Sequence, residues 1–179
     1  GRVTTGSGND VIELSGGQID AIYETWGNYS SIWTRNRDAT SVITGSGDDT
    51  ITLTGTIKSR GNSYGQIDGG DGNDTIDASS TTAVRTLSGG TGDDIIYGAQ
   101  VWTGHIYAGA GDDIIQAGNG EGNIAESYIY GDDGNDTITS GTNQGDRIYI
   151  YGGKGNDTIN AGDANNTIYG YDGSTKRDE

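Results

Sequence analysis

The sequence predicts an all-β protein whose chain winds into a right-handed parallel β-helix of about eight coils, most of them 18 to 25 residues long. Two observations predict this fold. A short glycine- and acid-rich motif returns at similar intervals along the chain, and an apolar residue stands at a fixed place on each side of it. Since one repeat of this length cannot bury its apolar face alone, the repeats must stack to form a continuous core.

The repeated motif is nine residues long and occurs in seven good copies. They share glycine at the fourth position, aspartate at the sixth and isoleucine at the eighth: TGSGNDVIE from Thr5, TGSGDDTIT from Thr44, GGDGNDTID from Gly69, GGTGDDIIY from Gly89, AGAGDDIIQ from Ala108, GDDGNDTIT from Gly131 and GGKGNDTIN from Gly152. Their starts lie 39, 25, 20, 19, 23 and 21 residues apart. A degenerate copy begins at Gly170 and has Thr175 in place of the aspartate.

Two columns of apolar residues mark the expected inward positions of the two strands in each coil. One column is the eighth motif residue: Ile12, Ile51, Ile76, Ile96, Ile115, Ile138 and Ile159. The other is predicted two residues before each motif: Val3, Ile43, Ile67, Leu87, Ile106, Ile129, Ile150 and Ile168. With coils about 4.8 Å apart along the stack, these residues predict a thin core between two sheets.

The charge of the chain restricts its partners. There are 26 acidic and 10 basic residues, a formal net charge of −16, and only 30% hydrophobic residues. Nucleic acid and anionic membrane surfaces are poor partners at this charge, and no apolar run is long enough to span a membrane. The acids gather in the glycine-rich motifs, which indicates that bound cations offset the repulsion.

The motif has the chemistry of a calcium-binding turn. Glycine permits the positive φ angles of a sharp turn that points carbonyl oxygens at one place, and Ca²⁺ takes six to eight oxygen ligands. One turn cannot supply that many ligands, but two stacked turns can. Over essentially its whole length the chain resembles the RTX (repeats-in-toxin) family, whose calcium-binding pattern is G-G-x-G-x-D-x-U-x.

The resemblance implies that each ion lies between neighbouring turns of a β-roll. Carried onto this chain, the bridging carboxylates are Asp10, Asp49, Asp74, Asp94, Asp113, Asp136 and Asp157. The resemblance also places in the metal site the glycines of these turns, whose backbone carbonyls help to hold the ion: Gly6, Gly8, Gly45, Gly47, Gly70, Gly72, Gly90, Gly92, Gly109, Gly111, Gly134, Gly153 and Gly155. The fifth motif residue is expected to point outward: Asn9, Asp48, Asn73, Asp93, Asp112, Asn135 and Asn156.

The spacing of the motifs predicts calcium along one edge only. Motifs that follow one another directly, as in many family members, each make half a coil, whereas here they recur a full coil apart. Seven turns leave six gaps, so about six ions are expected, which would reduce the formal charge to about −4. Folding is therefore expected to depend on calcium.

The rest of the chain is expected to belong to the same module, covering residues 1–179 as part of a longer protein. Residues 15–41 are either an excursion from the stack or a degenerate coil, with Ile32 placed 20 residues after Ile12. No capping helix is evident at either end. The sequence leaves open whether further repeats follow or copies stack end to end.

An aromatic column is the second candidate site. Its members flank the upstream apolar column and should all face outward: His105, Tyr107, Tyr128, Tyr130, Tyr149, Tyr151 and Tyr169. Either these rings stack to stiffen the sheet, or they form a surface that binds carbohydrate, another domain or another protomer. A broken rank of outward threonines gives a weaker prediction of ice binding.

No pattern in the sequence indicates catalysis, since there is no cysteine, one histidine and no phosphate-binding loop. The chain is expected to be a calcium-dependent structural or adhesive module of a secreted or cell-surface bacterial protein, such as an adhesin or surface-layer component. The resemblance implies type I secretion and folding outside the cell. The alternative is a glycan- or partner-binding accessory module, using the tyrosine face, attached to a secreted enzyme.

Overall fold

The computed structural model describes residues 2–14, 30–31, 41–55, 65–81, 83–99, 102–118, 126–141, 147–162 and 165–170. Within these ranges all regular structure is strand, divided between two parallel sheets. The first sheet contains, in spatial order, β1 (Arg2–Thr4), β4 (Ser41–Ser46), β6 (Gln66–Asp71), β8 (Ala83–Thr91), β10 (Trp102–Ala110), β12 (Ser127–Asp133), β14 (Arg147–Lys154) and β16 (Asn165–Tyr169). The second contains β3 (Ser30–Ser31), β2 (Val11–Leu14), β5 (Thr50–Gly55), β7 (Thr75–Thr81), β9 (Ile95–Tyr97), β11 (Ile114–Gln116), β13 (Thr137–Thr139) and β15 (Thr158–Asn160).

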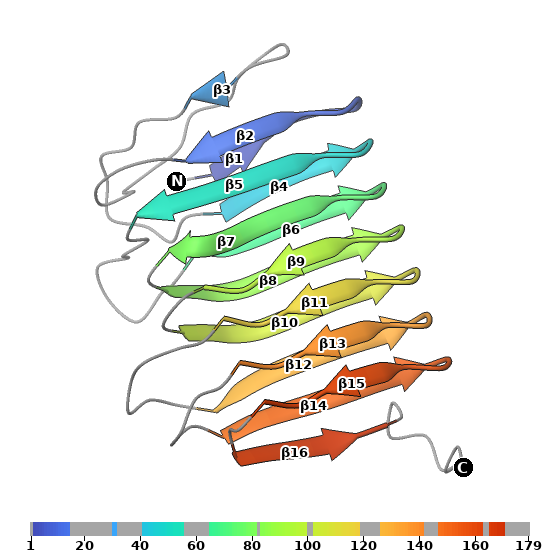
Figure 1. The fold of residues 1–179 in the computed structure, drawn as a ribbon. Helices are drawn as coiled ribbons and strands as arrows, with labels where there is room; N and C mark the ends of the chain where they lie inside the picture. Colours follow the sequence, from blue (N-terminus) through green and yellow to red (C-terminus); the bar gives the residue numbers. More distant parts are fainter. Residues whose placement is uncertain are drawn as a thin grey trace.

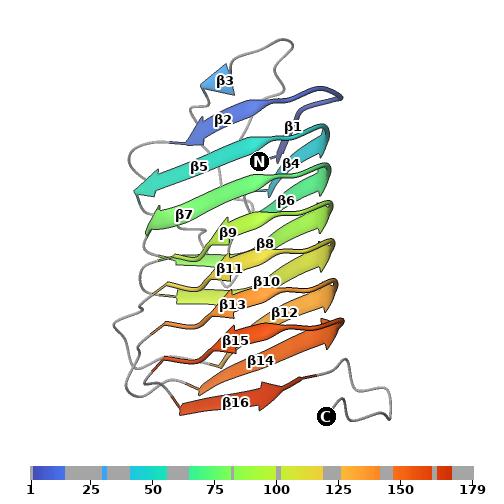
Figure 2. The ribbon, with the colours of Figure 1, turned by 45° about the vertical axis from the view of Figure 1, so that its right-hand side comes forward.

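The chain alternates between the two sheets and advances by one strand at each turn, so the fold is a parallel β-solenoid (Figure 1). Turned by 45°, the molecule shows the two sheets as separate layers along the whole stack (Figure 2). The predicted fold class is confirmed. The expected count of about eight coils is slightly too high: seven coils have a strand in both sheets, and within the described residues β16 has no following partner in the second sheet.

The strands pair in a register that aligns equivalent motif residues. In the second sheet Ile76 pairs with Ile51 and with Ile96. In the first sheet Gly70 pairs with Gly45 and with Gly90. Because a side chain's face alternates along a strand, this register keeps every eighth-position isoleucine on the same inner face.

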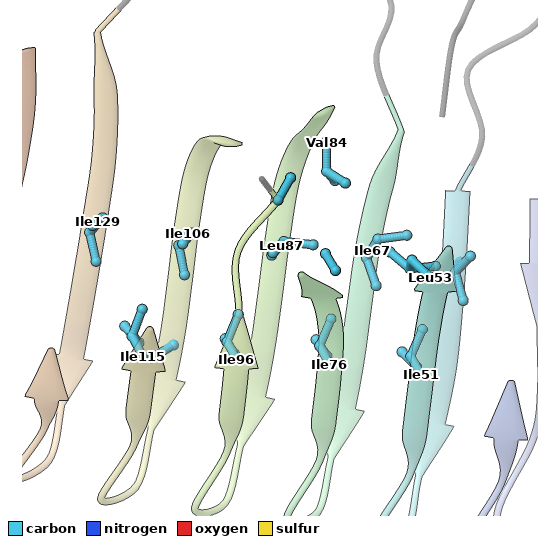
Figure 3. Packing of buried hydrophobic residues seen from close by; sticks show 14 of the residues in the cluster. Ile51, Leu53, Ile67, Ile76, Val84, Leu87, Ile96, Ile106, Ile115 and Ile129 are labelled. Carbon is cyan, nitrogen blue, oxygen red and sulfur yellow. The ribbon is translucent and has the colours of Figure 1, made fainter. Parts of the chain in front are cut away.

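The core is the single layer of side chains between the sheets (Figure 3). From Ile12 to Ile138 the eighth-position isoleucines are at most 1% exposed, and Ile159 is partly buried. Further buried apolar side chains lengthen this core away from the motif: Leu53, Ala78, Val84, Ala99 and Ile148. A core one side chain thick has few neighbours per residue, which makes the bonding between coils correspondingly important.

Two residues of the upstream column differ from the prediction. Val42, not Ile43, faces the core: Val42 is fully buried and pairs with Ile67, whereas Ile43 is half-buried and pairs with Asp68. The upstream column lies two residues before each motif, and Ile43 is only one residue before Thr44, on the opposite face of the strand. Ile168, in the last strand of its sheet, is 48% exposed.

The segment 15–41 lies mostly outside the described residues. Its described part includes β3, which pairs with β2 through Ile12 and Ser30 and extends the second sheet beyond the first coil. Ile32, the residue on which the degenerate coil depends, is not among the described residues.

Neighbouring isoleucines in β11 provide a matched test of the core. Ile115 is 1% exposed and Ile114 is 48% exposed. In the calcium-saturated protein, Ile115→Ala should lower the free energy of unfolding by about 2–5 kcal/mol because it leaves a cavity. Ile114→Ala should change it by about 0.5 kcal/mol or less. Urea denaturation measures both, and equal losses would contradict the assignment of the core face.

Candidate metal-binding edge

The first six residues of each motif form a tight turn between the two sheets, called here the motif turn. The motif turns lie above one another along one side of the stack (Figure 1). Twelve of the thirteen predicted turn glycines, all except Gly6, adopt positive φ: Gly8, Gly45, Gly47, Gly70, Gly72, Gly90, Gly92, Gly109, Gly111, Gly134, Gly153 and Gly155. At Gly72, with φ of +127°, a Cβ would also lie 2.3 Å from the Gly47 carbonyl oxygen, so both conformation and close stacking require glycine.

Backbone hydrogen bonds join each motif turn to the next. The Gly72 amide donates to the Thr91 carbonyl at 2.7 Å, and the Thr75 amide donates to the Asp49 carbonyl at 2.8 Å. Equivalent bonds recur along the stack. The turns are therefore held at the spacing of the sheets and do not splay apart.

The sixth-position aspartates form a ladder that crosses every gap between motif turns. In each gap Oδ1 accepts the backbone amide of the sixth residue in the preceding turn: Asp49 from Asp10 at 2.6 Å, Asp74 from Asp49 at 2.7 Å, Asp94 from Asp74 at 2.7 Å, Asp113 from Asp94 at 2.7 Å, Asp136 from Asp113 at 3.0 Å and Asp157 from Asp136 at 3.1 Å. Sequence spacing predicts this column of carboxylates, and the structure brings all seven residues into it.

The other carboxylate oxygen of the ladder has no partner. Oδ2 is buried without a hydrogen bond in six aspartates: Asp49, Asp74, Asp94, Asp113, Asp136 and Asp157. The first five of these residues are each only 1% exposed. A buried carboxylate oxygen without a partner is costly, and a cation removes that cost.

In the turns that begin with glycine, the unpartnered oxygen borders a small space that the absence of a side chain leaves free. A Cβ on Gly69 would lie 2.4 Å from Asp74 Oδ2 and 2.6 Å from the carbonyl oxygen of Gly89 in the next coil. A Cβ on Gly131 would meet Asp136 Oδ2 at 2.3 Å and the Gly152 carbonyl oxygen at 2.2 Å. One carboxylate and one carbonyl from successive turns thus border the same space, which is the mixed oxygen donor set that calcium prefers.

In the gaps after Gly69, Gly89 and Gly131 a backbone carbonyl lies beside the carboxylate oxygen. Among the described residues, no group of three or more histidine, cysteine, aspartate or glutamate side chains is arranged to hold a metal. A hard cation with flexible geometry, which accepts carbonyl ligands, fits this donor set, whereas Zn²⁺ with its histidine and cysteine preference does not.

Burial strongly raises the pKa values of aspartates in the sixth-position ladder. It raises the pKa of Asp94 and Asp113 from the ordinary 3.8 to about 7, and that of Asp74 and Asp136 to about 6. Neighbouring aspartates in the ladder raise these pKa values further, and the hydrogen bonds accepted from backbone amides oppose the rise. Without a cation, burial in the folded chain therefore shifts these carboxyls toward the protonated form.

The fifth-position residues form a second ladder on the solvent side. Each side-chain oxygen accepts the amide of the fifth residue in the following turn, for example Asn73 from Asp93 at 2.8 Å and Asp93 from Asp112 at 2.8 Å. The sixth-position ladder runs the other way, from each turn back to the preceding one. These exposed fifth-position side chains therefore cap the turns. The buried unpartnered oxygens of the motif turns belong to the sixth-position aspartates.

The aromatic candidates lie on the outer face of β10, β12, β14 and β16 as two columns of stacked rings. Ring centroids are separated by 5.2 Å for His105–Tyr128, 5.0 Å for Tyr128–Tyr149, 4.9 Å for Tyr107–Tyr130, 4.8 Å for Tyr130–Tyr151 and 4.7 Å for Tyr151–Tyr169. Planes within these columns differ by 8–20°. Most ring faces are thus turned toward a neighbouring ring, which leaves ring edges and hydroxyls for other contacts.

Comparison with known families agrees with this geometry. The family model for the RTX calcium-binding nonapeptide repeat (4 copies) matches residues 66–80, 86–100, 105–124, 121–144 and 149–175, together more than half of the chain. The protein belongs to this family. As an RTX protein it contains calcium-binding repeats, and five segments of its solenoid match the model directly. No curated protein and no solved structure gives a significant match. The described part of this RTX chain contains no helix capable of spanning a lipid bilayer.

The role of the first motif position was not predicted from the sequence. The first-position glycines do not need positive φ, but they leave a space beside Oδ2 of the sixth-position aspartate. The signal for this in the sequence is the recurrence of glycine at the first motif position. At the second position Asp132 replaces glycine and keeps the left-handed conformation, with φ of +73°. Asp132 pairs with Gly153 in the same register as the glycines of other coils, so the turn geometry overrides residue preference there.

Adjacent aspartates allow a matched test of the ladder in the RTX turn. Asp94→Asn keeps the shape but removes the charge next to the glycine space, so calcium binding should weaken at least about tenfold for the ions that Asp94 contacts. Asp93→Asn should have little effect, because four other described turns contain asparagine at this exposed position. Isothermal titration calorimetry measures both, and equal effects would contradict the different roles of the two positions.

The raised pKa values predict how protons act on the metal-free chain. Between about pH 4 and pH 7 the folded chain binds more protons than the unfolded one, because the pKa values of the buried aspartates rise from 3.8 to about 6 and 7. Stability without calcium should therefore increase as the pH falls through this window. Calcium affinity should decrease over the same range, since protons and Ca²⁺ compete for the carboxylates. Urea denaturation in chelator at several pH values, with parallel calcium titrations, measures both trends.

Proposed function

We propose that the chain is a calcium-dependent structural and adhesive module of a secreted or cell-surface bacterial protein, which folds when it meets calcium outside the cell. The observation that carries this proposal is the ladder of buried aspartates whose Oδ2 atoms have no partner. A formal net charge of −16 and a core one side chain thick make the metal-free fold weak. Calcium then contributes binding free energy directly to folding.

The proposed sites lie in the six gaps between the seven motif turns, giving about six ions per chain. In each gap the sixth-position aspartates and the carbonyl oxygens of the turns would hold the ion. Bound calcium supplies positive charge to the buried carboxylates and a link between successive coils. All seven motif turns lie on the same side of the stack, which supports a single row of ions along one edge.

The proposal joins folding to location. Cytosolic calcium is too low to fill sites of this kind when their affinities are weak, whereas extracellular modules bind calcium with dissociation constants of about 0.1–1 mM. A chain that remains unfolded inside the cell is suited to export through a narrow channel. Type I secretion, an adhesin or surface-layer role, and the absence of catalysis belong to this proposal.

A second candidate function is an accessory module that binds a partner through the tyrosine face. Seven aromatic or imidazole side chains share one outer surface, and tyrosine-rich surfaces favour protein contacts. Because most of these rings already stack on one another, the ring faces needed for carbohydrate stacking are covered. A protein domain or protomer therefore fits this face better than a sugar. Ice binding is weaker still, since Ile95, Tyr97 and Ile114 interrupt the threonine rank on the second sheet.

Circular dichroism during a calcium titration tests the leading proposal. Chelator-stripped protein at about pH 7.5 should be mostly unfolded. This pH lies above the raised pKa values of the buried aspartates, so protons do not replace calcium there. Adding Ca²⁺ should produce a cooperative rise in β signal, and the same concentration of Mg²⁺ should not, because Mg²⁺ demands octahedral geometry and retains its water. A chain that is fully folded in chelator and indifferent to calcium would overturn the proposal.

A further inference from the structure

The gap between the second and third motif turns has threonine at the first motif position, where most of the other gaps have glycine. In four of the seven motif turns the first residue is glycine, but the second turn begins with Thr44. Thr44 is fully buried at the motif edge, where a hydroxyl must find a partner. The family model does not extend to this turn, since its first matched segment begins at residue 66.

The Thr44 side chain occupies the space that glycine leaves free in the next turn. Beside Gly69, that space is bordered by the aspartate of the same turn, Asp74, and by the carbonyl of the following turn, at Gly89. The corresponding groups in the Thr44 gap are Asp49 and the Gly69 carbonyl. The Thr44 hydroxyl lies next to both: it donates to the Gly69 carbonyl oxygen and is close to the Asp49 carboxyl.

Asp49 still needs a further partner despite this contact. Its Oδ1 accepts the Asp10 amide at 2.6 Å, while Oδ2 is buried without a hydrogen bond. Three kinds of oxygen therefore meet in this gap: the Asp49 carboxylate, the Gly69 carbonyl and the Thr44 hydroxyl. Calcium accepts all three, and a hydroxyl gives it a neutral ligand in place of a water molecule.

Ala108 separates the effect of the hydroxyl from that of the β-carbon. It holds the same first position in the fifth turn and is fully buried, so the fold accommodates a Cβ there. Asp113, the aspartate of that turn, still accepts the Asp94 amide and still has an unpartnered Oδ2. What Thr44 adds to its gap is the oxygen atom.

We propose that Thr44 is a side-chain calcium ligand, which makes the gap between the second and third motif turns a distinct site within the row. This inference rests on the proposed function, since it requires that calcium fill the gaps. Thr5 begins the first turn and donates its hydroxyl to the Thr44 carbonyl, so the first gap shares the contact between hydroxyl and carbonyl. Its aspartate, Asp10, is only half-buried, whereas Asp49 is 1% exposed. Both threonine gaps lie at the N-terminal end of the stack, whereas the gaps after Gly69, Gly89 and Gly131 present no side-chain hydroxyl from this position.

Three substitutions at Thr44 test the proposal. Thr44→Val keeps the shape and removes the oxygen, Thr44→Ser keeps the oxygen, and Thr44→Gly admits water. Thr50→Val, on an exposed residue of β5, is the matched control. Calorimetry and elemental analysis after dialysis against limiting calcium give the affinity and the number of ions per chain. Circular dichroism at saturating calcium establishes that each variant folds.

We expect Thr44→Val to weaken one ion by at least about tenfold, while Thr44→Ser and Thr50→Val bind as the parent chain does. With Tb³⁺ in place of Ca²⁺, luminescence lifetimes in H₂O and D₂O should show more water per ion in Thr44→Gly. Unchanged binding in Thr44→Val would overturn the proposal, and so would an additional ion in Thr44→Gly, because the hydroxyl would then exclude calcium. A parent chain that binds no calcium would instead overturn the proposed function.

Discussion

The structure depends on one arrangement, a buried aspartate placed between two coils with only one of its two oxygens bonded. Oδ1 accepts an amide from the preceding turn and thereby fixes the side chain, so Oδ2 is presented at the same point in every gap. The bond positions the carboxylate but does not compensate its charge. Repeated along the stack, it concentrates negative charge inside a narrow protein, and protons or cations reduce the resulting repulsion.

Two neighbouring residues of the motif turn have different roles, one on the solvent side and one on the buried side. The fifth-position side chain caps the next turn from the solvent side, where asparagine serves as well as aspartate. The sixth-position side chain bonds in the opposite direction from a buried site, where the sequence has aspartate in all seven turns. An amide could supply the hydrogen bond to the backbone equally well, so the negative charge at this position is explained by a ligand and not by the fold alone.

The two columns of stacked aromatic rings, called here the aromatic ladder, connect the coils on the outer face of the first sheet. Parallel coils about 4.8 Å apart bring equivalent side chains to the distance at which rings stack, so a tyrosine repeated in register stiffens the face without any further design. The ladder occupies only the later coils, from β10 to β16. There, hydrogen bonds between turns, the isoleucine core and the stacked rings all act along the same axis and reinforce one another.

The sequence by itself determined the solenoid, its repeat length and the column of seven aspartates, because a fixed motif with fixed apolar neighbours has one consistent stacking. The prediction for Ile43 was wrong by one residue, because the position two residues before the motif belongs to Val42 and neighbouring residues of a strand face opposite sides. Only the tertiary structure decided what each oxygen does. Oδ1 and Oδ2 of Asp74 are equivalent in the sequence, and the difference between them arises from an amide and a carbonyl that belong to other coils, those of Asp49 and Gly89, 25 and 15 residues away. For the same reason Thr44 is one more small polar residue in the sequence, and becomes a candidate ligand only when the third coil lies against it.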